Sequence, residues 1–142
     1  MKRSALFHLH QRLGAVFGEY DGWALPARFG DAEAEAMHVD RALGLADVSG
    51  GMMTDLVLAG PRCREVLSKL TSLNIEDVAS AQASVAHVHC TLVREDLPHT
   101  LAYRLSITRD YAESFWDAVM HAGHEFQITA FGWEALQLLR GQ

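Results

Sequence analysis

The sequence has few basic residues and no long apolar run. Twelve lysines and arginines stand against eighteen aspartates and glutamates, which gives a net charge of −6 with the histidines neutral. Broad nucleic-acid binding depends on basic patches that displace counterions, so this balance disfavours it. No apolar stretch approaches the roughly 20 residues needed to cross a bilayer. Polar side chains interrupt the apolar stretch near the start, so we expect no signal peptide and a cytoplasmic location.

Cysteines and the common catalytic motifs are also scarce. The two cysteines, Cys63 and Cys90, form no CxxC motif, which favours two reduced thiols in a cytosolic protein over a disulfide. The chain contains no P-loop, no HExxH, no nucleophile elbow and no GxGxxG that leads from a strand into a helix. Gly50 and Gly51 precede a predicted strand, so a bulge or a close backbone approach is expected there rather than a phosphate site.

The composition that is present indicates a soluble globular domain. Hydrophobic residues make up 49% and charged residues 21% of 142 residues, which suits one domain over residues 1–142. Apolar residues at helical spacing predict a helix over 5–17, and glycine, aspartate and proline predict a loop over 18–30. A second helix is predicted over 31–43, capped by Asp31 and ended by a left-handed Gly44.

The rest of the chain alternates between predicted strands and helices. Strands are predicted over 52–59, 85–93, 101–107 and 126–129, and helices over 60–68, 108–121 and 131–140. Thr108 or Asp110 is expected to cap the helix at 108, Asp110 and Glu113 have the spacing of a capping box, and Gly123 is expected to end the helix. The sum is an α+β domain, a mostly antiparallel sheet with helices packed on one side.

Three short patterns suggest chemistry, and each also has a structural interpretation. His87 and His89 would share a face of a strand, and with Cys90 they suggest a metal site. Zinc needs three or four ligands and no second cluster has ligand spacing, so ordinary strand histidines and no metal are expected. Cys90 beside a histidine would make a nucleophile pair, although a strand cysteine more often fills a core. Glu95 and Asp96 either separate their pKa values for acid–base catalysis or form a solvated turn.

Three blocks of the sequence resemble the aminomethyltransferase family, which includes the glycine-cleavage T-protein and its folate-binding relatives. The blocks are residues 9–31 with GWALPARFGD, residues 35–71 with GLADVSGGMMTDLVLAGP, and residues 103–140 with GWEALQLLR. The resemblance implies a folate-binding fold, tetrahydrofolate as cofactor and one-carbon transfer. The last two blocks lie closer together than in full-length members. The chain is thus similar to compact one-lobe relatives, such as the gamma subunit of sarcosine oxidase and the folate-binding domain of a tRNA-modifying GTPase.

The same resemblance implies site residues. Asp96 matches the second acid of the Gly-Gly-x-x-Asp-Asp turn that carries the catalytic aspartate of the T-protein, although the glycines are absent here. Met52, Tyr103 and Arg104 match cofactor-binding positions. Arg104 stands where the family has a carboxylate that pairs with the pterin ring, and a guanidinium offers only donors. The family's Ser-His-Met reads Ser49-Gly50-Gly51 here, which removes another contact.

Two functional hypotheses follow from these residues. The first is a diverged aminomethyltransferase that uses tetrahydrofolate and is weak or inactive as an isolated chain, because of Arg104 and the missing glycine turn. The second is a non-catalytic subunit that docks on a larger enzyme through an apolar face, like the gamma subunit of sarcosine oxidase. A homodimer that builds its site across two copies is a further alternative.

Overall fold

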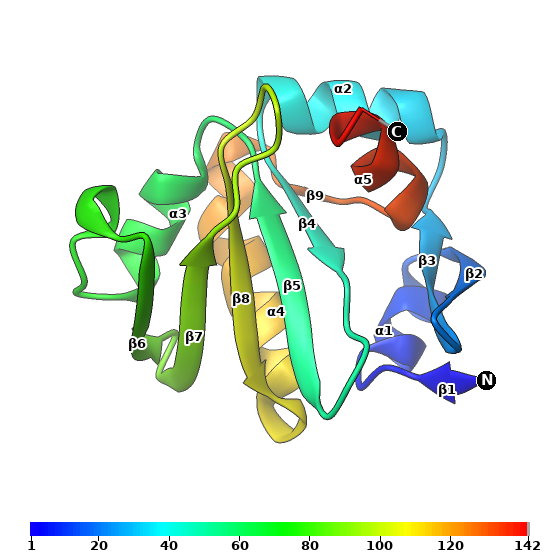
Figure 1. Ribbon diagram of the computed structural model, residues 1–142, viewed down its shortest axis with the longest axis horizontal. Helices are drawn as coiled ribbons and strands as arrows, with labels where there is room; N and C mark the ends of the chain where they lie inside the picture. Colours follow the sequence, from blue (N-terminus) through cyan, green and yellow to red (C-terminus); the bar gives the residue numbers. More distant parts are fainter. Residues whose placement is uncertain (142) are drawn as a thin grey trace.

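A six-stranded sheet forms the centre of the molecule (Figure 1). The computed structural model describes residues 1–141. The strand order is β6-β7-β8-β5-β4-β9, and every neighbouring pair is antiparallel except β4 and β9. The mostly antiparallel sheet predicted from the sequence is therefore confirmed. The strands are β4 (Gly44–Asp47), β5 (Met53–Ala59), β6 (Ser80–Val85), β7 (Val88–Arg94), β8 (Ala102–Thr108) and β9 (Thr129–Ala130).

A second, three-stranded sheet has the order β1-β3-β2. Its strands are β1 (Lys2–Arg3), β2 (Val16–Tyr20) and β3 (Trp23–Arg28). The loop predicted over 18–30 is wrong, because Asp21 and Gly22 both have positive φ and close a tight hairpin between β2 and β3. The helix predicted over 5–17 is too long. It covers only α1 (Phe7–Arg12), since Gly14 has a φ of 83° and turns the chain toward β2.

The remaining helices agree more closely with the sequence patterns. They are α2 (Ala32–Arg41), α3 (Cys63–Leu70), α4 (Ala112–Gly123) and α5 (Trp133–Leu139), with 3₁₀ turns at η1 (Ile75–Asp77), η2 (Arg109–Tyr111) and η3 (His124–Phe126). The Asp31 carboxylate caps α2 by accepting a hydrogen bond from the Ala34 N–H at 3.0 Å, as predicted. No helix among residues 1–141 is both long and apolar enough to span a membrane.

The cap predicted for α4 and the left-handed stop predicted for α2 are wrong. Neither Thr108 nor Asp110 makes a capping bond, because residues 109–111 wind into η2 before α4 begins. Helix α4 ends at Gly123 as predicted, although the left-handed residue is Gln127, which follows the 3₁₀ turn η3. Gly44 lies inside β4, where a Cβ would come within 2.6 Å of Phe131, so it is kept small by close packing rather than by backbone conformation.

Helices cover both faces of the central sheet. On one face, α3 and α4 pack on Leu56, Leu105 and Ile107 and bury Phe115 and Trp116, and Figure 1 shows α4 behind β5 and β8. On the other face, α2 and α5 cover a second apolar cluster on β4, β5 and the start of β8. The α+β class is confirmed, while the one-sided placement of the helices holds for α3 and α4 only.

The second face is apolar only beneath α2 and α5. Farther along the strands, Gln82, Thr91, Ser106 and Asp55 lie opposite one another across β6, β7, β8 and β5. This polar row and its neighbour Arg104 lie outside both apolar clusters. Functional groups on this part of the sheet therefore stay accessible while the opposite face holds the main core.

Candidate functional site

Two clefts meet at Arg104 on the polar part of the sheet. The smaller, with a volume of about 200 Å³, lies between the 95–98 turn and the end of α5. The larger, of about 370 Å³, lies between the 49–53 turn, the β2–β3 turn and α5. Arg104 lines both, and we call the two clefts together the Arg104 groove. Its lining includes Val57, Asp96, Leu136 and Arg140 in the smaller cleft and Tyr20, Met52, Asp55 and Trp133 in the larger.

An ion pair occupies the centre of the groove. The Arg104 Nη2 atom lies 3.7 Å from Asp55 Oδ2, and the side chains are 36% and 16% exposed. The Ser106 hydroxyl donates to the other Asp55 oxygen from the facing position on β8. Asp55 is therefore engaged from two sides. Within residues 1–141 the Arg104 side chain makes no other ion pair or hydrogen bond. Most of its five N–H donors therefore have no protein acceptor.

Asp96, the predicted catalytic residue, lies in the turn after β7 at the edge of the smaller cleft. Arg94 binds one carboxylate oxygen at 2.9–3.0 Å, and the Ala102 N–H donates to the other at 3.1 Å. Partial burial raises the pKa of Asp96, but the hydrogen bonds from Arg94 and Ala102 outweigh it and hold the pKa below its usual range. At neutral pH Asp96 is thus an anion that accepts hydrogen bonds. It carries no proton to donate as a general acid.

The predicted cofactor-binding residues lie on two sides of the sheet. Met52 is 87% exposed on the turn that borders the larger cleft. Tyr103 and Arg104 are consecutive on β8 and point to opposite faces. The Tyr103 ring is fully buried in the main core, and its hydroxyl accepts a hydrogen bond from Arg64 Nε at 3.2 Å. The fold therefore brings Met52, Asp96 and Arg104 to one groove and leaves the Tyr103 side chain across the sheet.

An aromatic wall completes the larger cleft, and sequence patterns did not indicate it. The Tyr20 and Trp133 rings stack with centroids 4.9 Å apart and planes inclined by 15°. The Arg140 guanidinium lies over the Trp133 ring, 5.5 Å from its centroid. Burial and the nearby Glu134 carboxylate raise the pKa of Tyr20. The wall joins residues from β2 and α5, so no local pattern could have shown it.

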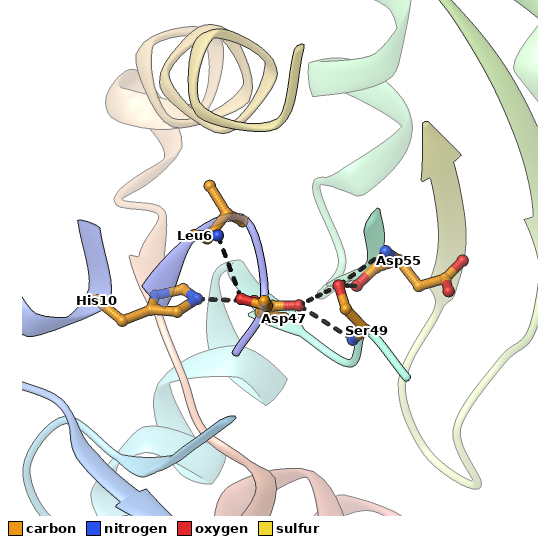
Figure 2. Close-up of polar contacts among 6 residues, drawn as sticks. Leu6, His10, Asp47, Ser49 and Asp55 are labelled. Carbon is orange, nitrogen blue, oxygen red and sulfur yellow. Dashed lines mark hydrogen bonds and ion pairs between the residues drawn. The ribbon is translucent and has the colours of Figure 1, made fainter. Parts of the chain in front are cut away.

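A buried polar network lies behind the groove and fixes its floor (Figure 2). Asp47, 2% exposed, receives hydrogen bonds at one oxygen from His10 Nε2 at 2.9 Å and from the Ser4 hydroxyl at 2.6 Å. At the other oxygen it receives the Ser49 N–H at 3.0 Å and the Ser49 hydroxyl at 2.5 Å. Burial raises the pKa of Asp47, but the hydrogen bonds from His10, Ser4 and Ser49 outweigh it and lower the pKa. Asp47 is therefore a carboxylate held ionised in the core.

The network connects the start of the chain to the groove. The Ser49 oxygen that binds Asp47 also accepts a hydrogen bond from the Asp55 N–H at 3.0 Å. Figure 2 shows the resulting line from His10 through Asp47 and Ser49 to Asp55. The Asp-Val-Ser pattern at 47–49 was visible in the sequence, but its partners were not, because His10 lies 37 residues away.

The other candidate patterns separate in the structure. His87 lies in a turn with a φ of 64°, His89 is exposed on the polar face, and Cys90 is buried on the core face. No group of three metal-ligating side chains comes together within the described part of the chain. Burial raises the pKa of Cys90 to about 11 and that of Cys63 to about 12. Both thiols therefore stay protonated at neutral pH, which supports the core interpretation of Cys90.

Comparisons with known proteins give a consistent result. The family described as "GCVT N-terminal domain" matches residues 50–141. An aminomethyltransferase of Lysinibacillus sphaericus is 27% identical over 135 residues, which cover 91% of this chain and 36% of the relative. The sarcosine oxidase subunit alpha of Rhizobium meliloti is 32% identical over 105 residues, which cover 66% of this chain and 11% of the relative. The chain thus spans only part of the length of the curated relatives it matches.

A solved structure confirms the fold that the sequence predicted. The glycine cleavage system aminomethyltransferase T from Bartonella henselae superposes with a TM-score of 0.78, over 98% of this chain and 62% of that one. The two sequences are 14% identical over this match, so the likeness establishes the α+β architecture and no more.

Proposed function

The chain belongs to the GCVT N-terminal domain family, and on that basis we propose that it is a diverged aminomethyltransferase-like domain, compact over residues 1–142. As an isolated chain it is weak or inactive in tetrahydrofolate-dependent aminomethyl or one-carbon transfer. The Arg104 groove is the place where a folate-type ligand would bind. The observation that carries the proposal is the Arg104–Asp55 pair at the centre of that groove.

The donors and acceptors of the groove fit a pteridine poorly. A pteridine ring presents an amine and a ring N–H, which need an acceptor that is free to receive them. Asp55 already pairs with Arg104 and Ser106, and Asp96 already accepts from Arg94 and Ala102. Releasing either carboxylate would leave its present donors without a partner, at a cost of about 1–3 kcal/mol. That cost corresponds to a loss of roughly 5-fold to 150-fold in affinity.

Calorimetry with tetrahydrofolate tests this proposal. The wild-type chain should bind tetrahydrofolate only weakly, with a dissociation constant well above the micromolar range. A double variant, Arg104→Glu with Asp55→Asn, restores a carboxylate at position 104 without placing two anions side by side. It should bind about tenfold more tightly or better, because a charge-assisted acceptor replaces a donor. Arg109→Glu combined with Asp110→Asn makes the same net charge change at exposed positions that do not line the groove, and it should leave the affinity unchanged.

Micromolar binding by the wild-type chain would contradict the proposal. So would equal affinities of the wild-type chain and the double variant, because the guanidinium would then have no influence on recognition. The melting temperature of each variant, measured without ligand, separates a loss of binding from a loss of folding. A ligand that binds only the folded state raises the melting temperature. Melting temperatures measured with tetrahydrofolate present therefore give a second measure of affinity.

A second candidate function is that of a subunit that works beside other domains. The name of one relative, a subunit, and the small share of two relatives that is matched support it. The match in the sarcosine oxidase subunit alpha covers 11% of that chain, and the match in the human dimethylglycine dehydrogenase covers 10% of it at 33% identity. Genes for oxidase subunits next to this one would favour docking, and genes for glycine-cleavage components would favour transfer. Co-purification of a neighbouring gene product in a fixed ratio would then establish the subunit role, and two separate peaks would reject it.

A further inference from the structure

Strand β6 is an outer edge of the six-stranded sheet, and no other strand within residues 1–141 pairs with its far side (Figure 1). Open edges expose a row of backbone N–H and C=O groups, and most proteins protect them with charges, proline, bulges or very short strands. The sequence of β6, SAQASV, has six residues with neither a charged side chain nor a proline. Its register with β7 contains no shift. The edge therefore has none of the usual protection.

The other three sheet edges of the molecule are protected. Strand β9 has only two residues. Strand β1 also has two residues, and both, Lys2 and Arg3, are charged. Strand β2 carries Glu19 and has an irregularity in register between Val16 and Phe17. Because the three other edges are protected and β6 is not, β6 is the edge that is suited to pair with another strand.

Backbone hydrogen bonds determine which groups of β6 point outward. The Arg94 N–H donates to the Ala79 carbonyl, and the Glu95 N–H donates to the Ala102 carbonyl. Even-numbered residues of β7 therefore bond to β6, and odd-numbered residues bond to β8. In an antiparallel pair the bonded residues alternate, so Ala81 and Ala83 bond inward. The N–H and C=O groups of Ser80, Gln82 and Ser84 consequently point away from the sheet.

The residues along this edge read the same in both directions. The run Ser80-Ala81-Gln82-Ala83-Ser84 is a palindrome centred on Gln82. A second copy that runs antiparallel would place Gln82 opposite Gln82, each alanine opposite an alanine and each serine opposite a serine. The three outward-pointing residues would then form hydrogen-bonded pairs with one another, and no like charges would meet. Their side chains are all exposed, so pairing requires no rearrangement of the core.

We propose that β6 is a homodimer interface, in which two copies pair antiparallel about a twofold axis through Gln82. The two six-stranded sheets join into one continuous sheet. Because the twofold axis is perpendicular to the sheet, both polar faces lie on the same side of the dimer, with one Arg104 groove in each half. The contact is isologous and closes on itself, so it stops at two copies. This interface is independent of whether the groove binds a folate.

Sedimentation analysis of the full chain over a range of concentrations tests the interface. The wild-type chain should show a concentration-dependent mass that reaches twice that of one chain. Gln82→Lys places two like charges opposite each other and should weaken the dimer by about tenfold or more. Gln82→Glu should do the same. Gln11→Lys is the matched control, since Gln11 is exposed on α1, and it should dimerise like the wild type.

Mixing the two charged variants is the decisive step. Gln82→Lys and Gln82→Glu together should form a heterodimer, because opposite charges then face each other at the centre of the pair. Unchanged circular dichroism and melting temperature in every variant show that the monomer fold is intact. A wild-type chain that stays monomeric at millimolar concentration would overturn the interface. Dimers of Gln82→Lys as stable as the wild type, or a mixture that stays monomeric, would overturn it as well.

Discussion

Replacing Asp47 by asparagine should remove a large part of the stability of the fold. Asparagine has the same shape, but it carries no charge and its amide nitrogen cannot accept a hydrogen bond. Whichever way the amide is turned, its N–H₂ group displaces either the pair of donors from Ser4 and His10 or the pair from Ser49. Breaking one of these buried pairs of charge-assisted hydrogen bonds lowers the free energy of unfolding by about 3 kcal/mol. Urea denaturation of both proteins at pH 7 measures this difference.

The effect of this substitution should depend on pH in a defined direction. The carboxyl of an unfolded aspartate titrates near a pKa of about 3.9, and the folded protein holds the pKa of Asp47 below its ordinary value. The stabilising contribution is therefore complete above the unfolded pKa and is lost as the pH falls through the folded pKa. The difference between the wild type and the variant should be constant from pH 7 to about 5 and shrink below about 4.

Asp117→Asn serves as the control, because Asp117 is exposed on α4 and carries the same functional group. Its free energy of unfolding should change by less than about 0.5 kcal/mol. A cost of Asp47→Asn no larger than that of this control at pH 7 would refute a stabilising role of the Asp47 carboxylate. A difference that grows as the pH falls would refute it as well, because the carboxylate would then be destabilising in the folded state.

Two further substitutions and one labelling experiment test local features of the structure. His87→Gly should raise the free energy of unfolding by about 1 kcal/mol, because His87 has a φ of 64° in the β6–β7 turn; an unchanged or lower melting temperature contradicts this. Gly60→Ala should lower it by more than about 2 kcal/mol, because a Cβ would lie 2.5 Å from the Ala42 carbonyl oxygen and φ is +134°; thermal denaturation decides. Cys63 and Cys90 should react with a thiol reagent far more slowly in the native state than in urea, since both are buried; rapid native labelling would contradict their burial.

Local patterns predicted the elements that short-range chemistry determines. Alternation predicted β5, and Asp31 was correctly identified as the cap of α2. The hairpin of β2 and β3 was missed because glycine, aspartate and proline were interpreted as loop residues, although Asp21-Gly22 is a hairpin turn signal. Strand β6 was missed because serine, alanine and glutamine have little preference for strands. Its place depends on pairing with β7, which is a tertiary effect.

The groove was only partly visible in the sequence. Family resemblance drew attention to Asp96 and Arg104, which do line a common groove. The partner of Arg104 was not indicated, because Asp55 becomes its neighbour only through the pairing of β5 with β8. The stacking of Tyr20 on Trp133 likewise joins residues that lie far apart along the chain. Contacts of this kind depend on register and topology, and a single sequence contains no direct record of either.

The chain of hydrogen bonds from α1 to Asp55 makes the Arg104 groove depend on the first residues of the protein. Ser4 and His10 supply two of the four donors that keep Asp47 charged in the interior. Without that opening segment the buried carboxylate keeps only the two donors of Ser49, whose hydroxyl also accepts from the Asp55 N–H at the border of the larger cleft. Trimming or tagging the first ten residues should therefore disturb the Arg104 groove at a distance, although neither Ser4 nor His10 lines it.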